Sequence, residues 1–208
     1  MFITYISNTM EQIGLLRLWR KDIFLEYTLS EAVHHSKRKT KTWVFNTLKI
    51  LATQNYLHIE KKGNVNVYRL NTKNPCALQA LQFLDAKPDF SQIELIQDII
   101  SHVPSHCYCL IVFGSYVTKQ VGNSDIDICF LVENETMGKR MKPYVREAKL
   151  EHTVDLDDHY ITFDDFVRML LRKEENLGKQ VYRKHMLFYN PDIYYSLIKE
   201  AHNHGFRA

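Results

Sequence analysis

The feature that most constrains this chain is a pair of apolar segments separated by glycine, serine and two closely spaced aspartates. The run CYCLIVF at 107–113 is followed by Gly114-Ser115 and, nine residues after that serine, by SDIDICFLV at 124–132. Short apolar runs bounded by turn residues are typical of buried strands. We therefore expect two strands of one small domain, with the polar residues gathered where the first strand ends and the second begins.

The two aspartates predict a metal site. Side chains two residues apart on a strand share a face, so Asp125 and Asp127 point to the same side. Parallel carboxylates repel one another unless a divalent cation neutralises them, and Mg²⁺ is the natural occupant of an oxygen site. Gly114 lets the backbone approach a ligand, and the Gly114-Ser115 turn offers N–H groups and a hydroxyl to phosphate oxygens. Alone, either motif is an ordinary turn or a solvated strand end, but their joint occurrence is far more restrictive.

The sequence FGSYVTKQVGNSDIDICFLV resembles the signature of the DNA polymerase beta-type nucleotidyltransferase superfamily, and most of all its minimal nucleotidyltransferase branch. The resemblance covers residues 105–165 most firmly. It implies a small mixed sheet flanked by helices, a nucleotide held by Gly114, Ser115, Ser124 and Lys119, and two Mg²⁺ ions held by Asp125, Asp127 and a third carboxylate. Many relatives carry a basic residue and then glycine at the third and fourth positions after the serine. This chain has Thr118 and Lys119 there, and we expect Lys119 to replace the basic contact.

The third carboxylate is expected on a further strand after a helix at about 140–150. The segment HTVDLDDHYIT at 152–162 supplies that strand, with Asp155 and Asp157 on one face. Asp155, in a V-D-L context typical of the family, is the first choice. Asp157 is the alternative, because it shares the face and a shift of one residue pair exchanges the two.

The N-terminal third predicts a winged helix-turn-helix domain. Thr28 and Glu31 have the spacing of a helix capping box. A longer helix from about Lys41 carries Val44, Leu48 and Leu51 at positions typical of a core-facing stripe. A glycine-containing turn at 61–64 separates two strand-like segments. The order helix, helix, hairpin is that of winged helices of prokaryotic regulators, which residues 10–72 resemble.

Charge favours duplex DNA as the partner of this domain. Residues 1–72 hold 11 Lys or Arg against 5 Asp or Glu, net +6, whereas residues 73–208 have a net charge of −3. We expect phosphate and base contacts from one basic and polar set on the longer helix, the segment before it and the wing: Lys37, Arg38, Lys39, Lys41, Thr42, Asn46, Lys49, Lys61 and Lys62. A solvated basic face used for dimerisation or protein docking is the alternative.

The expected domain organisation follows from these patterns. We predict a winged helix at 1–72, connecting helices at 73–104 after the polar, proline-ended segment Asn71–Pro75, and a nucleotidyltransferase domain with C-terminal helices at 105–208. The fold class is α+β. The longest apolar run has seven residues, too short for a membrane span, and the first ten residues lack the features of a secretory signal, so we expect a cytoplasmic protein.

The expected function is Mg²⁺-dependent transfer of a nucleoside monophosphate, AMP from ATP or the equivalent from another nucleoside triphosphate, to a hydroxyl. Relatives in toxin–antitoxin pairs modify a tyrosine of a HEPN partner, so the resemblance implies a HEPN-type protein as the first acceptor and an aminoglycoside-type small molecule as the second. The alternative is a DNA-binding regulator whose nucleotidyltransferase domain senses nucleotide or a partner without turnover. A homodimer is left open.

Overall fold

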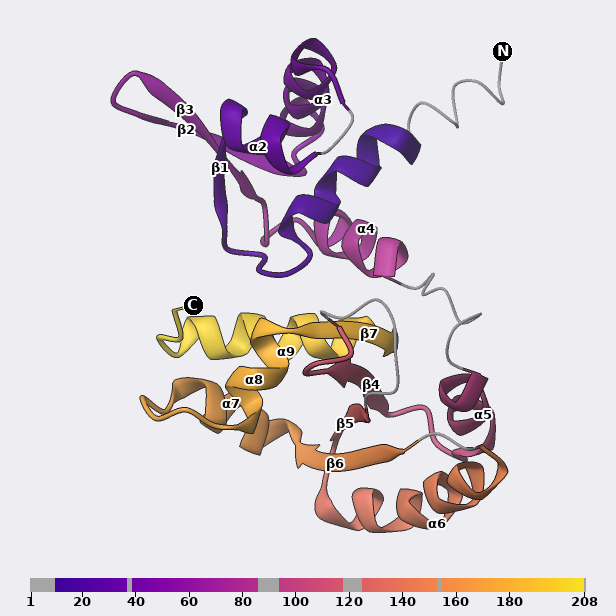
Figure 1. Ribbon diagram of the computed structural model, residues 1–208. Helices are drawn as coiled ribbons and strands as arrows, with labels where there is room; N and C mark the ends of the chain where they lie inside the picture. The colour runs from indigo at the N-terminus through magenta and orange to yellow at the C-terminus, as the bar shows by residue number, and fades with distance from the viewer. Residues whose placement is uncertain (1–9, 37–38, 86–93, 118–124, 153–154, 208) are drawn as a thin grey trace. The chain divides into compact units, whose positions relative to one another are not determined.

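The computed structural model describes residues 10–36, 39–85, 94–117, 125–152 and 155–207 (Figure 1). The chain divides into two compact units, Met1–Leu84 and Asp85–Ala208. Helices and strands are mixed along the chain, and the strands form two separate sheets. This agrees with the expected α+β class. Among the described residues, no helix combines the length and the apolar character that crossing a membrane requires.

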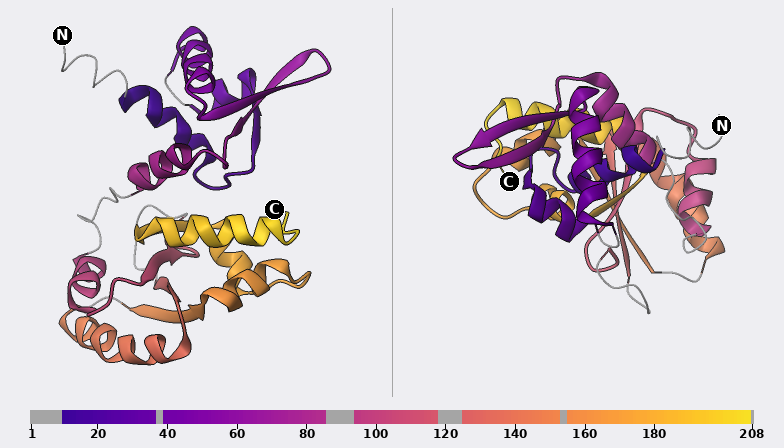
Figure 2. Two further views of the ribbon diagram at one scale, coloured as in Figure 1. Left: turned by 180° about the vertical axis from the view of Figure 1, so that it is seen from behind. Right: turned by 90° about the horizontal axis from the view of Figure 1, so that it is seen from above.

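The first unit contains a three-stranded antiparallel sheet of order β1-β3-β2. Its elements in chain order are η1 (Gly14–Trp19), β1 (Glu26–Thr28), α2 (Leu29–His35), α3 (Lys41–Thr53), β2 (Leu57–Lys62), β3 (Val65–Leu70) and α4 (Pro75–Asp85). The β2–β3 hairpin extends away from α2 and α3, as Figures 1 and 2 both show. The order of helix, helix and hairpin that the sequence predicts is present.

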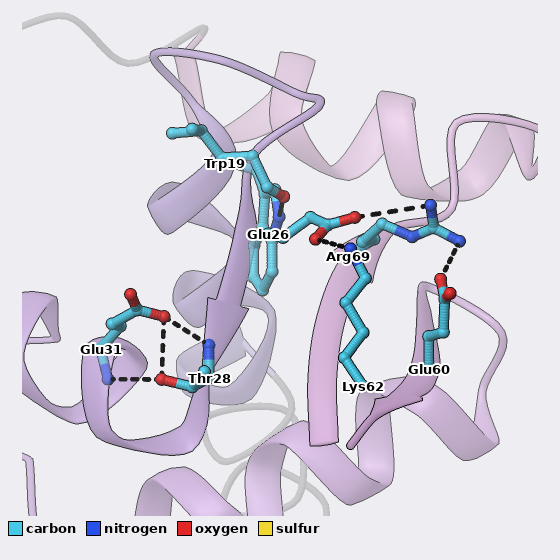
Figure 3. Close-up of polar contacts among 8 residues, drawn as sticks. Trp19, Glu26, Thr28, Glu31, Glu60, Lys62 and Arg69 are labelled. Carbon is cyan, nitrogen blue, oxygen red and sulfur yellow. Dashed lines mark hydrogen bonds and ion pairs between the residues drawn. The ribbon is translucent and has the colours of Figure 1, made fainter. Parts of the chain in front are cut away.

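Two local predictions for these helices are confirmed. The Thr28 hydroxyl accepts a 3.3 Å hydrogen bond from the N–H of Glu31, and the Glu31 carboxylate accepts a 2.7 Å bond from the N–H of Thr28, which completes the capping box (Figure 3). In α3 the predicted apolar stripe is fully buried, while the polar stripe on the opposite side is exposed: Thr42, Asn46, Lys49 and Thr53. The helix therefore presents a polar surface to solvent over its whole length.

The segment Asn71–Pro75, which the sequence analysis placed at the domain boundary, is a structured turn within the first unit. Asn71 is buried, and its side-chain amide donates 3.0 Å hydrogen bonds to the backbone and side-chain oxygens of Asn55. The Oδ1 atom of Asn74 accepts a hydrogen bond from the N–H of Cys76 in the first turn of α4. The two units divide after Leu84, so the predicted connecting segment 73–104 is shared between them.

The second unit contains a four-stranded mixed sheet of order β6-β5-β4-β7. Its elements are α5 (Glu94–His102), β4 (Tyr108–Phe113), β5 (Ile126–Val132), α6 (Glu135–Glu151), β6 (Leu156–Thr162), α7 (Phe163–Leu171), α8 (Leu177–Arg183), β7 (His185–Tyr189) and α9 (Pro191–Asn203). The strand β4 pairs antiparallel with both β5 and β7, whereas β5 and β6 are parallel and are joined through α6. A parallel pair needs such a crossover connection.

Helices cover both faces of this sheet (Figure 1). On one face, α5 and α6 pack against alternate residues of the central strands, among them Leu110, Val112, Ile128 and Phe130. The remaining strand positions belong to the other face, where α7, α8 and α9 contact β4 and β5. Asp127 is two residues before the buried Cys129 and therefore lies on this second face, at the end of β5 where the strand begins.

Candidate active site

The end of β4 is shaped to receive a carboxylate. Gly114 follows Phe113 directly and has a φ of 75°, a conformation that L side chains rarely adopt. A Cβ atom at this position would lie 2.3 Å from Oδ2 of Asp127, far inside van der Waals contact. Since Phe113 pairs with Asp127 in the antiparallel ladder, the strand pairing itself brings the carboxylate to the glycine. Only glycine leaves room for the Asp127 side chain in this orientation.

The parallel pairing of β5 with β6 brings a second carboxylate to the same place. Asp127 is the register partner of Asp157. One ligand atom from each of Asp127, Asp157 and His159 lies within 4.8 Å of the others. Within this group, Nε2 of His159 is 3.2 Å from Oδ2 of Asp157. The three side chains form a compact set of ligand atoms at the sheet edge, and we call it the Asp-Asp-His cluster.

The register distinguishes the two candidates for the third carboxylate. Asp157, the alternative in the sequence analysis, belongs to the cluster, whereas Asp155 precedes β6 and is not part of it among the described residues. The backbone oxygen of Asp155 accepts a 2.9 Å hydrogen bond from the N–H of Ile126. This bond holds β5 and β6 in the register that pairs Asp127 with Asp157. His159 was missed by sequence reasoning. Its position two residues after Asp157 was the available signal, because alternate residues of a strand share a face.

The other predicted nucleotide and metal ligands are not members of the cluster, and two of them lie outside the described residues. Asp125 is exposed and lies immediately before β5, so it is close in sequence to the cluster without being one of its three members. Ser115, directly after Gly114, is exposed. Lys119 and Ser124 lie outside the described residues.

Electrostatics favour a cation at the Asp-Asp-His cluster. Burial raises the pKa of the Asp127 carboxyl above its ordinary value, and the charges of Asp157 and Asp125 raise it further, against an opposing effect of His159. A carboxylate whose ionised form is disfavoured in this way gains from a nearby positive charge. Two carboxylates and an imidazole within reach of one another, beside a glycine that leaves space, therefore fit a divalent metal ion.

The residues predicted to contact DNA form two surfaces of the first unit. On α3, Lys41, Thr42, Asn46 and Lys49 are exposed, and the Lys49 ammonium lies 4.5 Å from the centre of the Phe45 ring. Immediately before α3, Lys39 forms an ion pair with Glu11. Lys37 and Arg38 lie outside the described residues.

The predicted wing is less basic than its sequence indicates. Lys62 is 2.5 Å from a carboxylate oxygen of Glu26 on β1, and Arg69 contacts both Glu26 and Glu60 (Figure 3). Lys61 is exposed on the same hairpin. These ion pairs connect all three strands on one face of the sheet, and they neutralise part of the charge that the wing contributes.

Comparison with known families gives a match within the second unit. Residues 94–194 match the family described as Polymerase beta, Nucleotidyltransferase. The matched segment contains Gly114 and all three members of the Asp-Asp-His cluster, and it excludes the first unit. The comparisons with curated proteins and with solved structures gave no significant match. The match supports the predicted superfamily for this domain and a nucleotidyltransferase function in general.

Proposed function

On the basis of the nucleotidyltransferase match at residues 94–194, we propose that this protein transfers a nucleoside monophosphate, AMP from ATP in the first instance, to a hydroxyl acceptor and releases pyrophosphate. The observation that carries the proposal is the register pairing of Asp127 with Asp157 beside Gly114. It supports a metal-dependent reaction, since two carboxylates from different strands converge where a glycine turn offers its backbone to phosphate oxygens.

Each residue of the site has a role in this proposal. Asp127 and Asp157, with Asp125 at the strand entrance, hold two divalent ions, Mg²⁺ in the simplest form of the proposal. When bound, such ions would act as Lewis acids on the phosphate oxygens and would lower the pKa of the attacking hydroxyl. The backbone at Gly114 and the hydroxyl of Ser115 hold the triphosphate, and Lys119 and Ser124, which lie outside the described residues, add further contacts to it.

The acceptor and the branch of the superfamily belong to the same proposal. The resemblance of FGSYVTKQVGNSDIDICFLV to minimal nucleotidyltransferases favours a protein hydroxyl, as in antitoxin-like members that modify a tyrosine of a HEPN-type partner. The partly exposed edge strand β6 leaves Asp157 accessible, which suits a large acceptor better than a closed pocket would. A cytoplasmic location and a homodimer are compatible with it.

Transfer of radiolabel from α-labelled ATP to protein, with and without the product of a neighbouring gene, tests the reaction. We expect Asp157→Asn to reduce transfer by about 10²-fold or more, because it removes one of the carboxylates that hold the metal. The matched variant Asp155→Asn is expected to stay within about threefold of the wild type, since its side chain lies outside the cluster. If only Asp155→Asn is damaging, the site assignment is wrong.

We further propose that the first unit is a winged helix that binds duplex DNA. The exposed polar stripe on α3 and the projecting β2–β3 hairpin support this, because a helix in the major groove and a wing on the backbone are the contacts that such domains make. The exposed polar stripe on α3 and the projecting hairpin also favour a second candidate function, a DNA-binding regulator that binds nucleotide without transferring it. Nucleotide binding with no radiolabel transfer to any acceptor would decide for that candidate.

The DNA proposal predicts a strong salt dependence for the full chain. If about five phosphates are contacted, the logarithm of the association constant should fall with the logarithm of salt at a slope near −4 to −5. The double variant Lys41→Ala, Lys49→Ala should flatten the slope by about 2 if both residues meet phosphates. Lys139→Ala, an exposed lysine of α6, is the control and should leave the slope unchanged. Binding indifferent to salt would favour a protein-docking module.

A further inference from the structure

His159 adds a nitrogen atom to a site that would otherwise consist of oxygen ligands. It lies on β6 two residues after Asp157, so both side chains occupy the same face of the strand. The side chain of His159 is 32% exposed, and its Nε2 atom, not Nδ1, is the atom near Asp157. The packing of its ring against Phe113, with centroids 5.7 Å apart, holds the imidazole beside the end of β4. The ring is therefore both oriented and accessible.

The spacing of the ligand atoms fits simultaneous coordination. Two ligands at right angles, each at the usual distance of about 2.1 Å from a metal ion, are about 3 Å apart. The 3.2 Å between Nε2 of His159 and Oδ2 of Asp157 agrees with this value. The carboxylate of Asp127 is close enough to both to be the third ligand. An ion bound between Nε2 of His159 and Oδ2 of Asp157 needs little movement of either side chain.

The nitrogen ligand changes which ion the site prefers. Mg²⁺ takes oxygen ligands almost exclusively and keeps much of its water, whereas imidazole is a good ligand for divalent transition metals. We propose that His159 is a direct metal ligand and that the Asp-Asp-His cluster selects a divalent transition ion such as Mn²⁺ over Mg²⁺. This inference deepens the proposed function and rests on it for the role of the ion, but its test measures binding and needs no turnover.

The experiment uses the full chain, Mn²⁺ and pulsed electron paramagnetic resonance, which detects a nitrogen nucleus bound to the ion. We expect nitrogen coupling in the wild type and its loss in His159→Ala. In parallel titrations His159→Ala should weaken Mn²⁺ binding by about tenfold or more and Mg²⁺ binding by less than about threefold. His159→Asp, which restores an oxygen ligand, should bind Mg²⁺ more tightly than His159→Ala while showing no nitrogen coupling.

His106→Ala is the matched control. His106 is an exposed histidine of the same unit whose Nδ1 bonds to the hydroxyl of Tyr189, and it lies outside the cluster. This variant should keep both the coupling and the Mn²⁺ affinity. A wild-type Mn²⁺ complex without nitrogen coupling, no binding of Mn²⁺, or an equal loss of both metals in His159→Ala would overturn the proposal.

The outcome is separable from that of the proposed function. If the chain transfers nucleotide but its Mn²⁺ complex lacks nitrogen coupling, the role of His159 is wrong and the enzyme assignment stands. If the coupling is found but no nucleotide is transferred to any acceptor, the metal site stands and the enzyme assignment fails.

Discussion

Replacing Asp127 with asparagine should abolish nucleotide transfer and at the same time stabilise the metal-free protein. The loss of activity should be on the order of 10³-fold or more, as for other residues at the centre of a catalytic group. Asp127 is the cluster member on the central strand β5, where its register partners are Phe113 of β4 on one side and Asp157 of β6 on the other.

The stabilisation follows from the direction of the pKa shift. Burial, together with Asp157 and Asp125, raises the pKa of Asp127 in the folded protein above its ordinary value of 3.8. A raised pKa means that the ionised group opposes folding once the pH exceeds the folded-state pKa, and that this effect is absent below 3.8. Asp127→Asn should therefore raise the melting temperature at pH 7 in the presence of a chelator. The gain should shrink as the pH is lowered towards 4.

Asp158→Asn serves as the comparison for both measurements. Asp158 neighbours Asp157 in sequence but forms an ion pair with Lys149 of α6, on the other face of the sheet. This variant should retain transfer and should not gain stability, since it loses a favourable partner. Wild-type turnover by Asp127→Asn, or a lower melting temperature at pH 7, would contradict the placement of Asp127 in a cluster of like charges.

Replacing Gly114 with alanine is expected to remove activity by a different route. The added methyl group would meet Oδ2 of Asp127 at 2.3 Å, so either the carboxylate or the backbone must move. The positive φ adds strain of about 1–2 kcal/mol for a residue with a side chain. We expect transfer to fall by about 10²-fold or more, because displacement of a catalytic group by about an ångström has effects of this size.

Gly205→Ala separates strain from steric exclusion. Gly205 also has a positive φ, 103°, but nothing lies within 4 Å of the position of its added Cβ atom. Thermal unfolding should show a cost for both variants, whereas a transfer assay should show a defect for Gly114→Ala alone. Equal activity of the two variants would mean that the Gly114 turn is not part of the site.

Sequence reasoning located the strands of the site but not their register. Alternation placed Asp125 and Asp127 on one face, and it also placed Asp155 and Asp157 on one face, since both pairs are two residues apart. Whether Asp127 pairs with Asp155 or with Asp157 depends on where α6 ends and β6 begins. In the structure, the hydrogen bond from the N–H of Ile126 to the backbone oxygen of Asp155 belongs to the register that pairs Asp127 with Asp157. A helical crossover can change its length by a turn without changing its apolar pattern, so the pattern could not fix the pairing.

The same limit explains two results in the first unit. The polar segment at 71–75 has the composition of a linker, yet Asn71 is buried because Asn55, far away in sequence, accepts its hydrogen bonds. Likewise, Lys62 was predicted to meet phosphate from its position in the hairpin, while its ion pair with Glu26 depends on β1 lying beside β3. Local pattern predicted the elements, and the partners that come from distant parts of the chain required the structure.

The place of β7 in the second sheet has a consequence for how the chain is made. All six residues of β4 are buried, and its ladder with β7 joins Leu110 to Tyr189, a residue that the ribosome adds long afterwards. The sheet of the first unit, by contrast, is complete once Leu70 has been synthesised. Domains fold as units during synthesis, so the first unit can fold before the second is complete. Until β7 has been synthesised, one edge of β4 has no partner strand, and an unpaired apolar strand edge promotes aggregation. Protection of that edge by a chaperone would matter most in this interval.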